Sequence, residues 1–529
     1  MPMNGVLSVL PSPADFRTMT RAPRRDLLCG LTVAVVALPL ALGFGVTSGL
    51  GAASGLITAI VAGSLAALFG GSARQVSGPT GAMTVVLVPI VHEYGANGVL
   101  TVGLISGFML LVLAFARAGT AMAYVPAPVI AGFTIGIACV IGLQQVPSAL
   151  GVPTPAGDQV AVVAARAAEE FDATPHWAAL LLALGSAALM LAGARWKPTV
   201  PFSLAAVGVA TVVAEALHLH VTRLGSLPSS LPAPSLAFLD VSRVPTLLLP
   251  AAAVAALAAL ESLLSASVAD AMRPGERHDP GKELFGQGIA NLAAPLFGGV
   301  PATGAIARTA VNVRTGAASR LAALAHAVIL AGIVAVAAPL VGRIPLAALA
   351  GVLLATAVRM VETDAVRAMA RSTRGDALVL VLTAAGTLAL DLVRAVLIGL
   401  AVSILLALRA AMRGTRLTPA QLPGAAGTVT YHFDGPLLFA AAHRFRRSLA
   451  DVRDVTAVDL RLSGLTAVDA TGALALKEAV GELRDRGIEV QITGVEGGHR
   501  RVLESLGVLP VNPTSNRGAI PSAAGATAP

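Results

Sequence analysis

The sequence predicts an α-helical polytopic membrane protein that ends in a small α/β domain. Of its 529 residues, 55% are hydrophobic and 12% are charged, which excludes an ordinary soluble globular protein. Apolar runs close to the length of about 20 residues that spans a bilayer recur between residues 27 and 411. After Arg416 the composition changes, and short strands alternate with helices.

The membrane region divides into two halves at a Pro-rich connector. With about 20 residues needed per span, each half supplies about seven runs, so about fourteen spans are expected. In the first half they lie near residues 27–50, 55–70, 80–91, 98–117, 124–145, 176–193 and 198–217. In the second half they lie near residues 247–270, 284–297, 303–316, 318–341, 345–360, 376–391 and 393–411. The expected domains are an N-terminal lead (1–25), a first repeat (26–226), the connector (227–246), a second repeat (247–412), an α/β domain (425–510) and a disordered tail (511–529).

The distribution of Lys and Arg predicts the orientation of these spans. With the N-terminus inside, about twenty basic residues fall on the cytoplasmic side and about five on the other, as the positive-inside rule requires. Both termini are then cytoplasmic. Because each half has an odd number of spans, the second half enters the membrane in the opposite direction, which predicts an inverted repeat. The net charge of +8 is scattered over these loops, which argues against a nucleic-acid partner.

Two stretches that contain Gly and Pro, one in each half, interrupt the apolar pattern. They are residues 77–85 (SGPTGAMTV) and 297–310 (FGGVPATGAIARTA). Gly and Pro break regular backbone, so each stretch is expected to be extended and to lead into a short helix that begins deep in the protein. The free N–H groups and the positive dipole end of such a helix favour an anion, and Arg308 adds a positive charge nearby. Paired interrupted spans predict a transport site built from two broken helices.

These and further motifs resemble the SulP sulfate-permease family of anion transporters. The resemblance covers residues 25–510 and rests on residues 39–44 (PLALGF), 259–265 (ALESLLS), 268–270 (VAD), 287–291 (QGIAN) and 298–309 (GGVPATGAIART). It implies a fold like that of the uracil transporter, with a core and a gate domain. It also implies an anion site between the half-helices of the third and tenth spans, a C-terminal STAS domain, a homodimer and a place in the bacterial inner membrane.

The resemblance also carries an expectation about the substrate. Within the family, the motifs at 259–264 and 301–309 look most like the bacterial branch that takes up dicarboxylates with protons, such as fumarate or succinate. Transport of sulfate or bicarbonate, with Na⁺ as another coupling ion, is the first alternative. Leu40 stands where many family members have Gln, so a polar substrate contact is missing, which weighs against sulfate. A channel-like anion pore or a membrane sensor with a STAS domain is the second alternative.

The interrupted stretches and the resemblance together nominate the substrate-binding residues. These are Phe44, Gly78, Thr80, Gly81, Thr303, Gly304, Ala305, Ile306, Ala307 and Arg308. The hydroxyls of Thr80 and Thr303 either donate to an anion or satisfy the broken backbone. The Arg308 side chain contributes to the charge of the site, reaches the cytoplasmic face or pairs with Glu261. Phe44 either lines the pocket or packs in the core.

Glu261 and Ser265 are the candidates for the coupling ion. Glu261 lies well inside the run 247–270, where a carboxylate is protonated, paired or placed in a wet cavity. Ser265 is four residues on and shares its helical face, whereas Asp270 faces elsewhere. In this hypothesis Glu261 takes up H⁺ as the substrate binds beside it. A purely structural carboxylate is the alternative, and the two side chains also offer oxygen ligands for Na⁺.

Nothing in the sequence indicates an enzyme, a metal site or a cofactor. His218 and His220 have no acidic or Cys partners at ligand spacing, and no Walker-type phosphate loop occurs. The expected partners are a small anion, a coupling ion and the lipid bilayer, and the STAS-like region is a candidate surface for protein partners.

The C-terminal region is expected to form the STAS domain. It predicts strands at 428–433, 455–462 and 489–493, and helices at 439–450, 473–486 and 499–506. Thr471 matches the place where bacterial STAS relatives carry a phosphorylatable Ser or Thr, and a phosphate there would lie at a helix N-terminus. The alternative is that Asp469 or Thr471 merely caps the helix.

Overall fold

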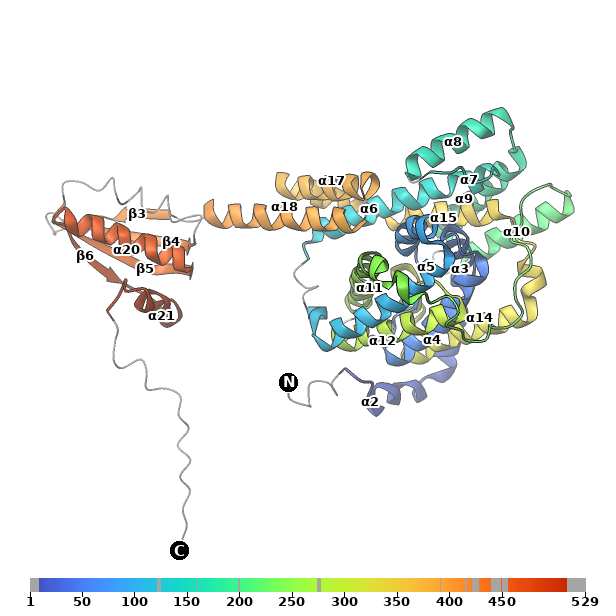
Figure 1. Cartoon of the computed structure of the whole chain (residues 1–529), viewed down its shortest axis with the longest axis horizontal. Helices are drawn as coiled ribbons and strands as arrows, with labels where there is room; N and C mark the ends of the chain where they lie inside the picture. The colour runs from blue at the N-terminus through green and yellow to red at the C-terminus, as the bar shows by residue number, and fades with distance from the viewer. Residues whose placement is uncertain are drawn as a thin grey trace, which may run out of the picture. The chain divides into compact units, whose positions relative to one another are not determined.

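The structure is a computed structural model, mostly helical, in which the chain forms two compact units, Met1–Ala401 and Val402–Pro529. It describes residues 9–120, 125–157, 159–197, 200–273, 277–390, 392–413, 416–420, 428–438, 449 and 455–510. The larger unit holds the helices of the membrane region except the second part of the last one. The smaller unit holds that part and a four-stranded sheet with its helices (Figure 1).

Helices occupy every run predicted in the first half. Their bounds are α2 (Pro13–Phe16), α3 (Pro23–Thr47), α4 (Ala52–Phe69), α5 (Gly81–Phe115), α6 (Ala127–Gln144), α7 (Val146–Leu150), α8 (Val160–Ala173), α9 (Trp177–Trp196) and α10 (Phe202–Ala216). The two runs at 80–91 and 98–117 both fall within α5, where Gly95 has φ 70° and breaks the helix between them. Helix α8 was not predicted as a span, because charged residues follow its apolar start.

The second half repeats this arrangement. Its helices are α11 (Val244–Met272), α12 (Pro280–Ala293), α13 (Ile306–Thr315), α14 (Arg320–Val341), α15 (Leu346–Met360), α16 (Thr363–Ser372), α17 (Arg374–Ala389) and α18 (Leu392–Arg413). Among the described residues, 8 helices are long and apolar enough to cross a membrane. Other helices of the region are shorter: α10, α12, α13 and α17 have 15, 14, 10 and 16 residues. The chain is therefore a multi-pass membrane protein.

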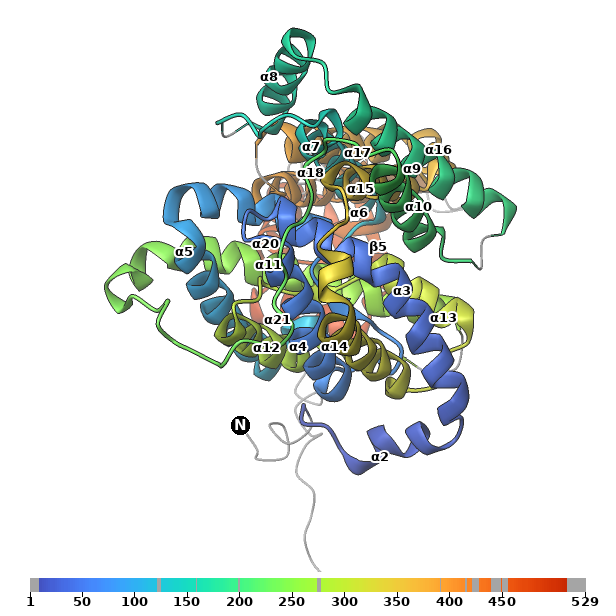
Figure 2. The ribbon, with the colours of Figure 1, turned by 90° about the vertical axis from the view of Figure 1, so that its right-hand side faces the viewer.

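The helices of the larger unit pack in two groups. In the core group, α3 packs on α14, α4 on α12, and α5 on both α11 and α12. In the gate group, α6 packs on α17, and α9 packs on both α10 and α15. Figure 2 shows α3 and α14 lying side by side. Glycines allow such close approach: a Cβ on Gly107 of α5 would lie 2.6 Å from the backbone nitrogen of Leu292 in α12.

A two-residue pairing joins the halves at their interrupted stretches. Strand β1 (Ser77–Gly78) runs antiparallel to β2 (Thr303–Gly304), with Ser77 opposite Gly304 and Gly78 opposite Thr303. The backbone N–H of Ala305 also donates to the carbonyl of Val76, at 2.9 Å. The expected meeting of the two stretches is thereby confirmed.

The smaller unit is an α/β domain with a four-stranded sheet. Its strands are β3 (Arg416–Ala420), β4 (Thr428–Leu437), β5 (Ala457–Val468) and β6 (Glu489–Thr493), in that order across the sheet. Strand β3 is antiparallel to β4, and the remaining pairs are parallel. Helices α20 (Ala470–Asp485) and α21 (Gly497–Ser505) follow β5 and β6, and Phe433, Leu460 and Leu476 are buried in the core.

Three of the four strands agree with the prediction from the sequence, although β4 and β5 extend farther. Strand β3 was missed because it is short and contains Pro419, a residue that a sheet accepts mainly at an edge. The predicted helix at 439–450 lies outside the described residues except for Leu449, and the predicted disordered tail at 511–529 lies outside them entirely.

Asp469 rather than Thr471 caps helix α20. The Asp469 carboxylate accepts a hydrogen bond from the backbone N–H of Gly472, at 2.7 Å. Thr471 lies in the first turn with its side chain exposed, so its hydroxyl is accessible. Its phosphorylation remains a prediction.

We expect Asp469→Ala to loosen the start of α20, since losing an N-cap acceptor costs about 1 kcal/mol. Hydrogen exchange of the full chain, read by mass spectrometry, should show faster exchange in the first turn of α20. Asp469→Asn keeps an acceptor and should exchange like the wild type. Equal protection in all three proteins would contradict the capping role.

Candidate functional site

The pairing of β1 with β2 brings two helix N-termini to one place inside the protein. Helix α5 begins at Gly81, shortly after β1, and α13 begins at Ile306, shortly after β2. Backbone N–H groups at the first turn of a helix have no partner within the helix, and the dipole makes this end positive. Two such ends beside each other favour an anion.

Thr80 links the start of α5 to the buried carboxylate of Glu261. Its hydroxyl accepts a hydrogen bond from the backbone N–H of Met83, at 3.3 Å, and donates to Oε2 of Glu261, at 2.8 Å. Thr80 is therefore the N-cap of α5, so its hydroxyl satisfies the broken backbone, which was the alternative to donating to an anion. It also positions the carboxylate of Glu261. Its hydroxyl proton is committed to Glu261 in this structure.

The start of α13 is the more open of the two helix ends. Its N-cap residue is Ala305, whose side chain has no acceptor, so no side chain caps this helix. Ala305 is buried, Ile306 is partly buried and Ala307 is exposed. The N–H groups of this first turn are thus the donors that are best placed to meet an anion.

Arg308 is fully enclosed behind the paired strands. Its side chain is 1% exposed, and its Nη2 donates to the carbonyl oxygen of Pro79. Its Nη1 is buried and has no hydrogen-bond partner among the residues that the structure describes. It would lie 2.7 Å from a Cβ on Gly78, whose φ is 151°. Arg308 therefore crosses from one half of the protein to the other, and the alternative in which it reaches the cytoplasmic face is wrong.

Glu261 lies close enough to Arg308 for their charges to interact, but the two side chains form no direct ion pair. Glu261 is 6% exposed and sits in α11. Its contact with Thr80 places it at the start of α5, beside the N-terminus expected to bind the anion. A carboxylate at this position changes the net charge of the site when it gains or loses a cation.

Thr303 and Gly304 are held against α11 by Ser262. The Ser262 hydroxyl accepts from the backbone N–H of Gly304, at 2.9 Å, and lies 3.0 Å from the hydroxyl of Thr303. The Thr303 hydroxyl also reaches the carbonyl of Ala258, at 3.3 Å. The Thr303 side chain is fully buried, and in this structure its hydroxyl bonds Ser262 and the carbonyl of Ala258, which belong to α11 and not to the broken backbone named in its alternative interpretation.

The hydroxyl of Ser265 belongs to a different chain of hydrogen bonds from the one that holds Glu261. Its hydroxyl donates to that of Thr309, at 3.0 Å, and the Thr309 hydroxyl accepts from the backbone N–H of Val76, at 3.0 Å. Ser265 therefore ties α11 to α13. Asp270 faces away, as expected, and lies 2.7 Å from Nδ1 of His278.

Phe44 and Ile141 cover the first residue of α5. A Cβ on Gly81 would lie 3.1 Å from Cε1 of Phe44 and 2.1 Å from Cδ1 of Ile141. Both side chains are buried, at 6% and 1% exposure. Phe44 thus lies beside the site as the resemblance implied, and Ile141 of the gate group was missed. Leu40, one turn before Phe44, is also buried.

Helix α12 supplies a supporting network that was not assigned from the sequence. The Glu283 carboxylate accepts from Nε2 of Gln287, at 3.0 Å, and Gln287 also donates to the Ser77 hydroxyl of β1, at 2.7 Å. Asn291 bonds both the N–H and the carbonyl of Ala302, at 2.8 and 2.9 Å. The sequence feature that could have revealed this network is the spacing of four residues between its polar members, which places them on one face of α12.

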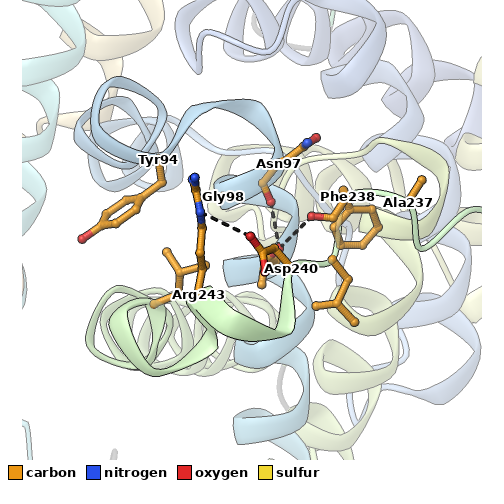
Figure 3. A pocket seen from close by; sticks show the side chains of 10 residues that line it. Tyr94, Asn97, Gly98, Ala237, Phe238, Asp240 and Arg243 are labelled. Atoms are coloured by element: carbon orange, nitrogen blue, oxygen red, sulfur yellow. Dashed lines mark hydrogen bonds and ion pairs between the residues drawn. The ribbon is translucent and has the colours of Figure 1, made fainter.

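A pocket at the break in α5 lies apart from this site (Figure 3). It has a volume of about 240 Å³ and is lined by Tyr94, Asn97, Asp240 and Arg243, among others. Tyr94 is about 20 Å along α5 from Gly81 at 1.5 Å per residue. Asp240 lies 3.4 Å from Arg243 and offsets its charge, so this pocket does not favour an anion.

A multi-pass helical protein with two interrupted spans paired inside it, beside a buried acid, has the architecture of a membrane transporter. The sulfate permease family model matches residues 24–383. A second model, the STAS domain, matches residues 419–518. The chain belongs to the sulfate permease family and is an anion transporter with a C-terminal STAS domain.

Relatives match along nearly the whole chain. A protein of Bacillus subtilis named "Putative sulfate transporter YvdB" is 33% identical over 499 residues, covering 92% of this chain and 94% of the relative. The "Bicarbonate transporter BicA" of Picosynechococcus sp. is 30% identical over 518 residues, covering 91% of this chain and 90% of the relative.

Solved structures confirm the fold. The transmembrane domain of a cyanobacterium bicarbonate transporter BicA matches with TM-score 0.64 and 30% identity, covering 74% of this chain and 98% of that one. The overall structure of SLC26A9 matches with TM-score 0.83 and 17% identity, covering 94% of this chain and 90% of that one. The second match concerns the fold alone.

We expect Thr80→Val to reduce transport at least tenfold, because it removes both the cap of α5 and the donor to Glu261, and hydrogen bonds to charged groups are worth about 1.5–3 kcal/mol. Uptake by purified protein in liposomes measures the effect. Thr80→Ser keeps the hydroxyl and should retain most of the activity. Equal activity of the Val and Ser variants would contradict the role of this bond.

Proposed function

We propose that the chain is a secondary active transporter of a small inorganic oxyanion, with sulfate and bicarbonate as the candidates. The pairing of Ser77 and Gly78 with Thr303 and Gly304 is the observation that supports this most directly. It sets the N-termini of α5 and α13 beside each other, with Glu261 bonded to the N-cap of α5 and Arg308 in the first turn of α13. A bacterial inner membrane with both termini in the cytoplasm is part of the proposal, supported by the distribution of Lys and Arg.

The names of the relatives favour inorganic anions over dicarboxylates. The relative from Bacillus subtilis is named a sulfate transporter, and the one from Picosynechococcus a bicarbonate transporter. The dicarboxylate uptake expected from local motifs has no such support, so fumarate becomes a competitor to be tested. Leu40 removes a polar side chain from the neighbourhood of Phe44, but backbone N–H groups remain as donors.

The charge of the site relates the substrate to the coupling ion. Two helix ends of about half a charge each, with Arg308 and an ionised Glu261, leave about one net positive charge. This matches a monovalent anion such as bicarbonate. When a proton or Na⁺ neutralises Glu261, about two positive charges remain, which match sulfate.

Glu261 is the group that we assign to coupling. Its carboxylate is buried, and its Oε2 already accepts a bond from Thr80, at 2.8 Å. A proton on the carboxylate, or Na⁺ shared between it and the Thr80 oxygen, lowers the cost of moving the site between the two sides of the membrane. Ser265 bonds Thr309 instead, so it acts in this mechanism by holding α11 on α13.

A channel-like pore and a STAS-linked sensor are separated from a carrier by one property. A carrier coupled to H⁺ or Na⁺ accumulates its substrate against a concentration gradient, a pore lets it equilibrate, and a sensor does not need flux. The buried bonds of Thr80 and Arg308 across the two halves favour a carrier, because they define a site that must rearrange to release an anion on either side.

The substrate proposal is tested by uptake of labelled sulfate and labelled bicarbonate into proteoliposomes, with fumarate as competitor. We expect one of the two inorganic anions to accumulate, and a tenfold excess of fumarate to leave its rate nearly unchanged. Imposed proton and Na⁺ gradients identify the coupling ion. Uptake of fumarate with no uptake of either inorganic anion would overturn the proposal.

The coupling proposal is tested by Glu261→Gln, which keeps the shape of the side chain but takes up neither a proton nor Na⁺ as a carboxylate does. We expect exchange of anion for anion to persist while accumulation driven by the gradient is lost. Asp270→Asn makes the same chemical change in the same helix, at the carboxylate that faces His278, and should remain coupled. A Glu261→Gln protein that still accumulates substrate would contradict the assignment.

A further inference from the structure

Glu283, in the first turn of α12, is a buried acid that the proposed mechanism does not use. It is 1% exposed. Its Oε2 accepts from the backbone N–H groups of Gly71 and Ser72, at 2.9 and 3.2 Å. Its Oε1 accepts from Nε2 of Gln75 and from Nε2 of Gln287, at 2.8 and 3.0 Å. Each oxygen thus meets two N–H groups, and none of these can accept a bond from a protonated carboxyl, so the arrangement fits an ionised carboxylate.

The two amides that face Glu283 leave their own carbonyl oxygens unpaired. Oε1 of Gln75 and Oε1 of Gln287 are buried, and neither has a hydrogen-bond partner among the residues that the structure describes. A buried carbonyl without a partner is costly, whereas an N–H bond to a carboxylate is stronger than a bond to a neutral group. The orientation of both amides therefore follows from the negative charge between them.

Positive groups on the neighbouring segments favour this charge. Arg320 of α14 lies close enough to act on the Glu283 carboxylate, as does the His278 imidazole when it is protonated. The acids nearby are themselves paired: Asp15 lies 3.7 Å from Nη2 of Arg320, and Asp270 lies 2.7 Å from Nδ1 of His278. The surroundings of Glu283 thus stabilise a negative charge without a direct ion pair.

Both amides reach the pair of strands that joins the two halves. Gln287 donates with the same Nε2 to the Ser77 hydroxyl of β1, at 2.7 Å. Gln75 lies against β2, because a Cβ on Gly304 would be only 2.0 Å from its Nε2. Ser77 and Gly304 are opposite each other in the pairing. The charge of Glu283 is therefore connected to both strands at a single residue pair.

Gly304 is the residue before the open end of α13. It is followed by Ala305, the N-cap residue whose side chain offers no cap. The N–H groups of this first turn are the donors best placed to meet an anion, so a shift of Gly304 moves them. Turning the Gln75 amide over would also place a carbonyl oxygen against Gly304, close to where the anion binds.

We propose that Glu283 is a positioning residue for the anion site. Its negative charge orients the amides of Gln75 and Gln287. These amides in turn hold the pairing of Ser77 with Gly304 where the start of α13 can meet the anion. Without the charge, both amides turn so that their oxygens accept from the neutral group, and Ser77 donates to Gln287 instead of accepting from it. The proposal rests on the proposed anion transport, and Glu283 itself does not touch the anion.

Glu283→Gln separates positioning from a simple effect of charge. The variant removes a buried negative charge, so the field alone would favour the anion and lower KM. Positioning predicts the opposite. In proteoliposomes we expect KM for the transported anion, labelled sulfate or labelled bicarbonate, to rise about tenfold, with kcat changed by less than about twofold. The introduced amide can donate to the oxygens of both turned amides, so the thermal unfolding temperature should be no lower than that of the wild type.

Two further variants test the route and the specificity of the effect. Gln75→Leu removes the amide that lies against Gly304 and leaves Glu283 charged, so KM should also rise. Combined with Glu283→Gln it should add little, because the two changes act through one contact, whereas additive effects would overturn the route. Asp26→Asn makes the same chemical change at a buried carboxylate of the core group that bonds Ser319, and should leave KM unchanged within about twofold.

Hydrogen exchange keeps the failure of this proposal distinct from the failure of the proposed function. Exchange over residues 303–309 of the full chain, read by mass spectrometry, should be faster in Glu283→Gln than in the wild type and in Asp26→Asn. If the wild type moves neither anion, the proposed function fails, and this measurement still tests the positioning. If the wild type transports and Glu283→Gln keeps or lowers KM, or loses only kcat, the positioning role alone is wrong.

Discussion

The antiparallel contact between β1 and β2 is the constraint on which the rest of the membrane unit depends. Extended backbone cannot satisfy its own N–H and carbonyl groups, and inside a bilayer no water replaces the missing partners. Each interrupted stretch therefore needs the other. Side chains complete what the short pairing leaves unsatisfied: Asn291 bonds Ala302, Thr309 bonds Val76 and Ser262 bonds Gly304. These bonds fix where the two helices begin and hence where positive potential collects.

The two helix ends are alike in origin but unequal in detail. Thr80 caps α5, and its hydroxyl donates a hydrogen bond to Glu261, whereas the Ala305 side chain cannot cap the start of α13. Arg308 lies behind the strands and bonds Pro79 across the halves, so its charge acts on the site through the protein instead of through open contact. The start of α5 is therefore coupled to a cation on Glu261, whereas the start of α13 presents N–H groups to an anion.

Much of the membrane architecture follows from local sequence. Apolar runs gave the helices, and Gly and Pro gave the two places where helices stop, because both effects act through neighbours in the chain. Glu261 could be selected for the same reason, as a carboxylate inside an apolar run. The polar residues of α12 carried a periodic signal too, with Glu283, Gln287 and Asn291 at intervals of four, but nothing local says what lies opposite them.

Local sequence alone determines that two broken spans exist, that Glu261 lies inside an apolar run, and that an α/β domain follows the membrane region. Only the tertiary structure decided the partners: Thr80 reaches Glu261 across 181 residues, and Phe44 and Ile141, from the two groups of helices, both cover Gly81. It also separated Ser265 from Glu261, although the two share a helix face. Helical periodicity fixes the direction in which a side chain points, but the atom that it meets depends on how distant segments pack.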